Sequence, residues 1–207
     1  MSVDLLRRWR ALAGEGADAL GERLIQAWGE PQRRYHAHGH LIWLLDEADR
    51  RAALIRDRTF VGYAIWFHDA VYQPGQGDNE TLSATWARTA LAAEPALAAR
   101  VAHVIEMTKN HAEGEAHGDA ALFLDMDFAI LGAAADVYKR YAADIRAEYP
   151  HVPDAAFAAG RGAFLAKQLE SPRTFRTNLY EQELGGTALI NMRWEFEELR
   201  AGRMVQA

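Results

Sequence analysis

The sequence contains no cysteine, which excludes disulfides, thiolate metal sites and cysteine nucleophiles. Any metal ion would therefore be held by His, Asp, Glu and water. The 6 prolines and 16 glycines are scattered, so no stretch has the composition of a linker. No internal repeat recurs at a fixed period. These absences predict a single domain over residues 1–207.

Long hydrophobic runs and an excess of basic charge are also missing. No window approaches the roughly 18 apolar residues of a membrane span, and residues 1–14 lack the apolar run of a signal peptide. We therefore expect a cytoplasmic protein that does not bind membranes. Lys and Arg number 23 against 29 Asp and Glu, a net charge of −6. This balance argues against an extended nucleic-acid partner, which needs a broad basic face, but not against a single nucleotide.

What is present is helical periodicity. Apolar residues recur at helical spacing along most of the chain, and strand-like alternation is nowhere sustained. The pattern predicts an all-α, single-domain helical bundle. Expected helices cover about 5–12, 20–28, 41–55, 60–71, 79–93, a stretch from 95, 119–131, 134–149, 154–170 and 186–201. Expected core residues of the late helices are Ile145, Phe164, Leu165, Leu169, Leu189, Trp194 and Leu199.

Three histidines fall within five residues at His36, His38 and His40. On a helix His36 and His40 share one face, because they are four residues apart. That spacing suits two metal ligands, or one ligand and one group that acts on a substrate. A polar helix start with solvent-facing histidines is the alternative, and the segment alone does not decide between them.

A His-Asp pair, His68 and Asp69, ends the strongly apolar stretch 60–71. An ionised carboxylate beside Trp66 and Phe67 is costly to bury unless it is paired or bound to a metal. Adjacent helical residues diverge by about 100°, yet both can reach one ion near a helix end. The alternative is a capping Asp beside a core His that donates to a carbonyl.

Two acids, Asp125 and Asp127, interrupt another apolar helix. Because they are two residues apart, they face nearly opposite ways, and only one is expected to point into a given site. Imidazoles and carboxylates from three helices suit Mn, Fe, Ni, Co or Zn better than Ca.

The order His, His-Asp, Asp over three helices resembles the HD superfamily of metal-dependent phosphohydrolases. The chain is most similar to the bacterial group described as predicted metal-dependent HD-superfamily phosphohydrolases, over roughly residues 30 to 200. The matching motifs are Tyr35-His36-x-x-x-His40, Phe67-His68-Asp69-x-x-Tyr72, Asp78-Asn79-Glu80-x-x-Ser83-Ala84, Leu124-Asp125-x-Asp127-x-x-Ile130-Leu131-Gly132, Ile145-Arg146-x-Glu148-Tyr149 and Asn191-x-x-x-Glu195.

The resemblance implies a bundle of the HD-domain type with one divalent cofactor site, for Mn, Fe, Ni, Co, Zn or Mg. Its metal ligands would be His40, His68, Asp69 and Asp127, with Asp125 as the alternative to Asp127. The implied activity is hydrolysis of a small phosphoester, of which a nucleotide is one candidate, by metal-activated water.

Further residues receive catalytic or substrate-binding roles. His36 would protonate the leaving oxygen, and Asp69 would orient the water as well as ligate the metal. Glu80 would act as a base or hold a metal-bound water, although a first-turn acid that complements the helix dipole is the favoured interpretation. Donors to the phosphoryl oxygens would be Arg33, Arg34 and Lys109, with Lys109 also counted as catalytic.

Two other functions remain open. HD-type sites can hold two irons for oxygen chemistry, which would require further ligands from His36, Glu80 or His111. The domain could instead bind a nucleotide or a partner without catalysis, with the metal as a structural element. Apolar faces on the late helices suit either the core or a homodimer.

Overall fold

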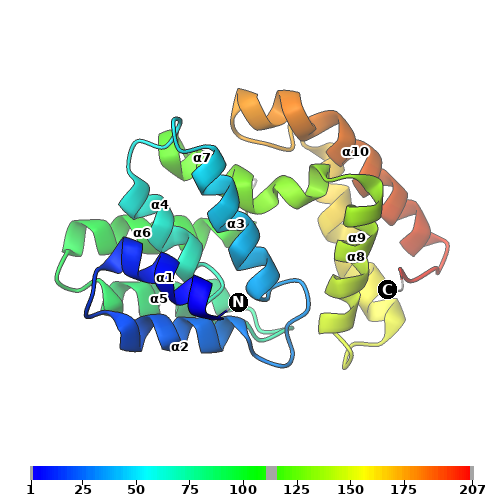
Figure 1. Ribbon diagram of the computed structural model, residues 1–207. Coiled ribbons are helices and arrows are strands. Elements are labelled where there is room, and N and C mark those ends of the chain that lie inside the picture. Colours follow the sequence, from blue (N-terminus) through cyan, green and yellow to red (C-terminus); the bar gives the residue numbers. More distant parts are fainter. Residues whose placement is uncertain (1, 111–115, 206–207) are drawn as a thin grey trace. The chain divides into compact units, whose positions relative to one another are not determined.

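We analysed a computed structural model that describes residues 2–110 and 116–205 (Figure 1). These residues form helices and connecting turns and no strand, which confirms the predicted all-α class. None of the helices they form is long and apolar enough to cross a membrane. In chain order the elements are α1 (Ser2–Ala13), α2 (Asp18–Trp28), α3 (His38–Arg50), α4 (Arg58–Phe67), α5 (Asn79–Ala90), α6 (Pro95–Met107), the 3₁₀ helix η1 (Thr108–Asn110), α7 (Gly118–Phe128), the 3₁₀ helix η2 (Ala129–Gly132), α8 (Ala135–Glu148), α9 (Asp154–Glu170) and α10 (Asn178–Arg200).

The described residues fall into two compact units. The first holds α1 to α6, η1 and α7 up to Met126, and the second holds η2 and α8 to α10, beginning at Asp127. The prediction of one domain over residues 1–207 stays a prediction, and each unit is described by itself.

Helix α4 is the centre of the first unit. It packs against α1, α3, α5 and α6, while α5 and α6 lie side by side (Figure 1). This helix contains most of the apolar stretch noted in the sequence, and its residues Ile65, Trp66 and Phe67 are fully buried. Asp57 begins the helix because its side chain accepts the Phe60 backbone N–H at 2.9 Å. Together with the Arg100 guanidinium, that bond holds the pKa of Asp57 below its ordinary value.

Helices α1 and α2 approach each other closely at Gly21. A Cβ atom added there would lie 2.3 Å from Cδ1 of Trp9, so only glycine fits without a shift of the indole. Trp9 is itself fully buried and donates its Nε1–H to the Ala17 carbonyl at 2.8 Å. Its ring makes edge-on contacts with Trp66 and Phe67. The first unit is thus organised around large aromatic side chains.

Two sequence expectations for the second unit are wrong. The last helix was expected from residue 186 but begins at Asn178, where Thr177 caps it by accepting the Tyr180 N–H. Gly185 and Gly186 cost the helix only about 1 kcal/mol each, which burial of its inner face outweighs. Leu189, expected in the core, is 38% exposed, because the helix turns that position outward.

A buried polar group joins α8, α9 and α10. Arg161 donates from Nε and Nη2 to the two oxygens of Glu195, at 2.8 and 3.0 Å, and from Nη2 to the Tyr141 hydroxyl. Tyr138 donates its hydroxyl to the same Glu195 carboxylate. Burial, and then the Glu195 charge, raise the pKa of Tyr138 far above its ordinary value. The Arg161 guanidinium therefore links α8, α9 and α10 through Glu195 and Tyr141.

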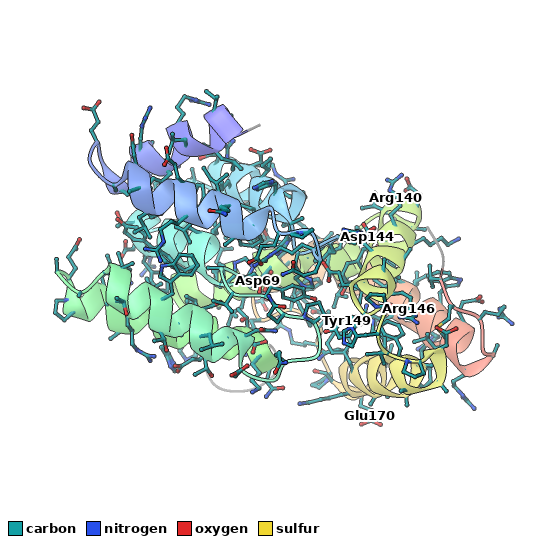
Figure 2. The ribbon with its side chains drawn as sticks, turned by 90° about the horizontal axis from the view of Figure 1, so that it is seen from below. Asp69, Arg140, Asp144, Arg146, Tyr149 and Glu170 are labelled. Carbon is teal, nitrogen blue, oxygen red and sulfur yellow. The ribbon has the colours of Figure 1, made fainter. Side chains whose placement is uncertain are left out.

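Arg146 also acts structurally, but locally. Its guanidinium donates to the Tyr149 carbonyl at 2.6 Å and the Val152 carbonyl at 3.0 Å, and it pairs with Asp154. Figure 2 labels Arg146 and Tyr149 next to each other. The side chain therefore fixes the turn between α8 and α9. Asn191 fixes the chain at the end of η2, because its amide donates to the carbonyls of Leu131 and Ala133.

Candidate metal centre

His68 and Asp69 follow the last residue of α4. The His68 backbone N–H still donates to the Ala64 carbonyl at 3.0 Å, so His68 caps the helix. Its side chain is 1% exposed and that of Asp69 is 17% exposed. A carboxylate at a helix C-terminus meets the negative end of the helix dipole. This position is unfavourable for Asp69 unless a positive charge lies beside it.

The hydrogen bond of the His68 ring defines its tautomer. Nδ1 lies 3.0 Å from the Ile65 carbonyl oxygen, which can only accept, so Nδ1 carries the proton. In the neutral ring Nε2 then presents a lone pair. That lone pair faces Nε2 of His40 at 3.3 Å and Oδ2 of Asp69 at 3.2 Å.

His40 comes from the first turn of α3 and is 5% exposed. Together His40, His68 and Asp69 place three ligand atoms within 4.8 Å of one another. A single proton can be shared by only two of these atoms at a time, whereas one cation can bind all three. In a tetrahedral site with metal–ligand bonds of about 2.0–2.1 Å, neighbouring ligand atoms lie about 3.3 Å apart. The two observed separations therefore fit a shared transition-metal ion.

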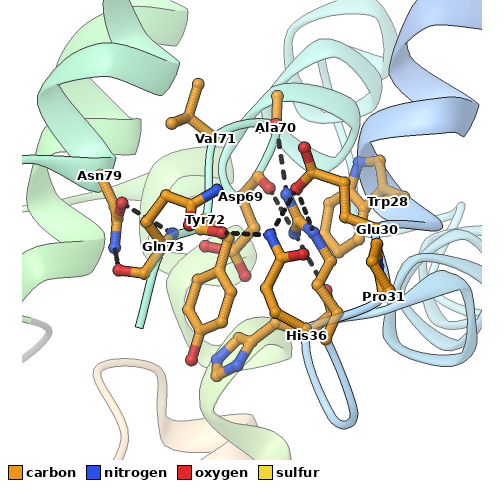
Figure 3. A network of polar contacts seen from close by, with 12 residues as sticks. Trp28, Glu30, Pro31, His36, Asp69, Ala70, Val71, Tyr72, Gln73 and Asn79 are labelled. Carbon is orange, nitrogen blue, oxygen red and sulfur yellow. Dashed lines mark hydrogen bonds and ion pairs between the residues drawn. The ribbon is translucent and has the colours of Figure 1, made fainter. Parts of the chain in front are cut away.

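Arg33 fixes the turn that follows α4. Its Nη1 donates to the carbonyls of His36 and Asp69 at 3.0 and 2.8 Å, and Nη2 donates to the Ala70 carbonyl at 3.3 Å. Figure 3 shows His36, Asp69 and Ala70, the residues whose carbonyls it contacts. Its Nε pairs with Glu30 at 3.2 Å. The carbonyls of Asp69 and Ala70 lie just beyond the last residue of α4. Arg33 therefore fixes the turn that follows the helix and brings positive charge near its C-terminus, where the dipole favours it.

Two aromatic rings enclose the same guanidinium, with its central carbon 5.5 Å from the Trp28 ring centroid and 5.4 Å from that of Tyr72. Trp28 also donates its Nε1–H to the Trp66 carbonyl at 3.0 Å. The predicted role of Arg33 as a phosphate donor is wrong, because the side chain is 0% exposed and its donors are directed at backbone and Glu30. Arg33 is a positioning residue for Asp69, which the sequence analysis missed.

Replacing Arg33 with lysine should lower the affinity for a divalent metal by about 10–100-fold, the usual effect of losing a partner behind the ligands. Lysine keeps the charge but cannot donate to three carbonyls in the plane of a guanidinium. The measurement is metal affinity by competition with a chromophoric chelator, at a temperature where the variant is folded. Arg56→Lys, at an exposed arginine, is the matched control. Equal affinities for the two variants would contradict the positioning role.

His36 lies near the group but not on the helix that was expected to carry it. α3 begins at His38, so His36 belongs to the preceding turn, and the shared helix face with His40 is wrong. Its ring nevertheless lies 6.1 Å from that of His40 and stacks on Tyr72 at 4.3 Å. His38 is structural, with Nε2 2.7 Å from the Ile25 carbonyl oxygen.

The segment after Asp69 is fastened to the start of α5. The Asn79 side chain accepts the Gln73 N–H and donates to the Gln73 carbonyl, both at 3.0 Å. Ser83 Oγ accepts the Val71 N–H at 3.0 Å. Sequence reasoning gave neither residue a role, although both belong to the motif Asp78-Asn79-Glu80-x-x-Ser83. They fix the path of the chain that leaves the metal group.

Glu80 and Lys109 lie near this segment in the first unit. Glu80 is half-buried in the first turn of α5, where an acid also complements the helix dipole. Lys109, on η1, donates its Nζ to the Gly77 carbonyl at 2.6 Å. Arg34 is exposed and donates to the carbonyls of Pro31 and Arg33. The catalytic and phosphate-binding roles of these three residues stay predictions.

Helix α7 brings Phe123 against His68, with ring centroids 5.7 Å apart. Asp125 is 2% exposed in the first unit, and Asp127 is half-buried as the first residue of the second. Asp127 as the distal metal ligand stays a prediction. His111, considered as a second-metal ligand, lies outside the described residues.

Comparisons with known proteins add no identification. The chain matches no family model, and neither curated proteins nor solved structures give a match. The case for a function therefore depends on the geometry of the metal group.

Proposed function

We propose that this protein is a metal-dependent phosphohydrolase of the HD type, which hydrolyses a small phosphoester. The observation that carries the proposal is the position of His68 Nε2, with His40 Nε2 at 3.3 Å and Asp69 Oδ2 at 3.2 Å. A proton on one of these atoms could be shared with only one other atom at a time, whereas one cation can bind all three. Zn, Mn, Fe, Co and Ni accept this combination of imidazole and carboxylate.

His40, His68 and Asp69 would hold the ion, since these three place their ligand atoms together. Asp127, predicted as the fourth ligand, belongs to the second unit, so its part in the site stays a prediction. Asp125, the alternative, is a buried acid of the first unit.

A bound divalent ion lowers the pKa of a coordinated water and polarises a phosphoryl oxygen. The remaining roles belong to side chains of the first unit. Asp69 has a second oxygen beyond Oδ2 that can accept a hydrogen bond from the attacking water. His36, half-buried and stacked on Tyr72, is oriented to hold or release a proton beside the group. Arg34, exposed on the same turn, would meet the phosphoryl charge that Arg33 cannot reach.

The reaction is tested by turnover of an aryl phosphate monoester, the corresponding diester and a nucleotide panel. We expect hydrolysis that stops on chelation and returns with Mn, Fe, Co, Ni, Zn or Mg. His103→Gln, at an exposed histidine, should keep full activity and is the matched control for substitutions of His40. A metal-loaded protein that turns over none of these substrates would overturn the proposal.

Elemental analysis of the purified protein distinguishes the di-iron alternative. The described residues supply one group of three possible ligands, so we expect about one metal ion per chain. Two irons per chain with consumption of oxygen would favour the oxygenase. Bound metal with no turnover of any kind would favour a binding module.

A further inference from the structure

A cavity lies in the first unit, and none of the candidate metal ligands lines it. It has a volume of about 440 Å³ and is lined by residues of α1, α3 and α4 and of the α3–α4 connection. This volume is within the range of about 300–1,000 Å³ typical of small-molecule sites. α4 contributes to both places, since Ile65 and Trp66 line the cavity while His68 and Asp69 follow at the end of the same helix.

The cavity wall is mostly apolar, and its rim carries three arginines and the carboxylate of Asp49. Its apolar lining includes Ala11, Leu12, Leu45, Ala48, Val61 and Ile65. Arg7 pairs with Asp4, and Arg8 pairs with Asp46 and more distantly with Asp4 and Asp49. The side chain of Arg58, an exposed residue, forms no ion pair or hydrogen bond with another described residue. Arg58 is therefore the arginine of the lining whose charge no carboxylate balances.

The cavity wall also contains a buried donor that lacks an acceptor. Trp66 is 0% exposed, and its Nε1–H has no hydrogen-bond partner among the described residues. Trp9 and Trp28, in the same unit, both donate their indole N–H groups to carbonyls. A buried donor without an acceptor is destabilising. The Nε1 atom is itself enclosed, so a ligand oxygen could accept this N–H only after the indole turns toward the cavity.

We propose that this cavity binds a small organic monocarboxylate with an apolar body. The apolar body would pack against the aliphatic lining. The carboxylate would pair with Arg58, and an oxygen of the ligand would accept the Trp66 Nε1–H. A neutral or cationic molecule of the same shape would leave Arg58 without its counter-charge. The site is separate from the metal group, and the proposal does not depend on phosphohydrolase activity.

The test uses 4-phenylbutyrate as the probe and ¹⁵N–¹H spectroscopy of the tryptophan side chains in the full chain. We expect 4-phenylbutyrate to shift the Trp66 indole N–H resonance saturably downfield, as a new hydrogen bond forms. The resonance is assigned by its absence in Trp66→Phe, or by backbone correlation if that variant does not fold. 4-Phenylbutanol and 4-phenylbutylamine should bind about tenfold more weakly or not at all, because a hydrogen bond to a charged group contributes about 1.5–3 kcal/mol.

Two variants make the result specific. Arg58→Gln should weaken the binding of 4-phenylbutyrate about tenfold and remove its affinity advantage over 4-phenylbutanol. Arg56→Gln, at a neighbouring exposed arginine outside the lining, should leave both the affinity and that advantage unchanged. Ala48→Leu should block binding by filling the cavity. The same affinities are expected with and without a chelator. The proposal is overturned if the Trp66 resonance does not move at about 10 mM probe, if acid and alcohol bind equally, or if Arg58→Gln behaves like Arg56→Gln.

Discussion

Replacement of His68 with alanine is expected to abolish divalent-metal binding. His68 Nε2 lies 3.3 Å from His40 Nε2 and 3.2 Å from Asp69 Oδ2, so its loss removes the ligand that is close to both of the others. The drop in affinity should exceed the 10–100-fold typical of a residue behind the ligands. Metal content after dialysis, and competition with a chromophoric chelator, measure the effect.

The isosteric variant Asp69→Asn separates metal binding from folding. Arg33 contacts the backbone carbonyl of residue 69 and not its side chain, so this variant should unfold at nearly the wild-type urea concentration while metal affinity falls sharply. His103→Gln should match the wild type in both respects. If His68→Ala and Asp69→Asn both retained wild-type metal affinity, the proposed centre would be wrong, and the His-Asp pair would be a structural helix end.

Substitution of Glu195 by glutamine should destabilise the second unit by about 3–5 kcal/mol, the usual effect of removing one partner from a buried ion pair. Arg161 would keep its charge, with its side chain 10% exposed, and lose the carboxylate that receives two of its donors. Tyr138 would lose the charge of its acceptor at the same time. Urea unfolding followed by circular dichroism measures the change.

Two comparisons test that explanation. Glu198→Gln breaks an ion pair with Arg203, whose side chain is 61% exposed, and should cost less than about 1 kcal/mol. The double variant Arg161→Met with Glu195→Met removes both charges and should recover much of the loss, since apolar replacement of a whole buried pair is often neutral. If Glu195→Gln were no more harmful than Glu198→Gln, the network would not be a source of stability.

The sequence predicted helices well where apolar spacing and local signals agreed. Pro95 begins α6 as expected, because proline suits the first helical turn. The start of α10 was missed, because the decision between loop and helix at Gly185 depends on contacts with other elements. One such contact joins η2 to α10. A Cβ atom added at Gly132 of η2 would lie 2.5 Å from Cβ of Leu184, in the part of α10 that the sequence analysis missed.

The candidate site was predictable in its ligand types and not in its supports. His40, His68 and Asp69 converge as the motif order predicted. Arg33 was taken for a phosphate donor, because its sequence context indicates charge but not the backbone carbonyls that surround it. The sequence around Arg33 does not show that its side chain meets the end of α4, because the Asp69 carbonyl that it contacts is 36 residues further along the chain. The unsatisfied N–H of Trp66 is likewise a tertiary property.

The contacts of Arg33 have an evolutionary consequence. Because its guanidinium holds main-chain oxygens at positions 69 and 70, the identities of those two residues can change without loosening the anchor. Selection could therefore exchange the carboxylate at 69 for another group, or remove it, while the architecture around it persisted. A lineage of such proteins could gain, alter or lose its chemistry through single substitutions on an unchanged scaffold.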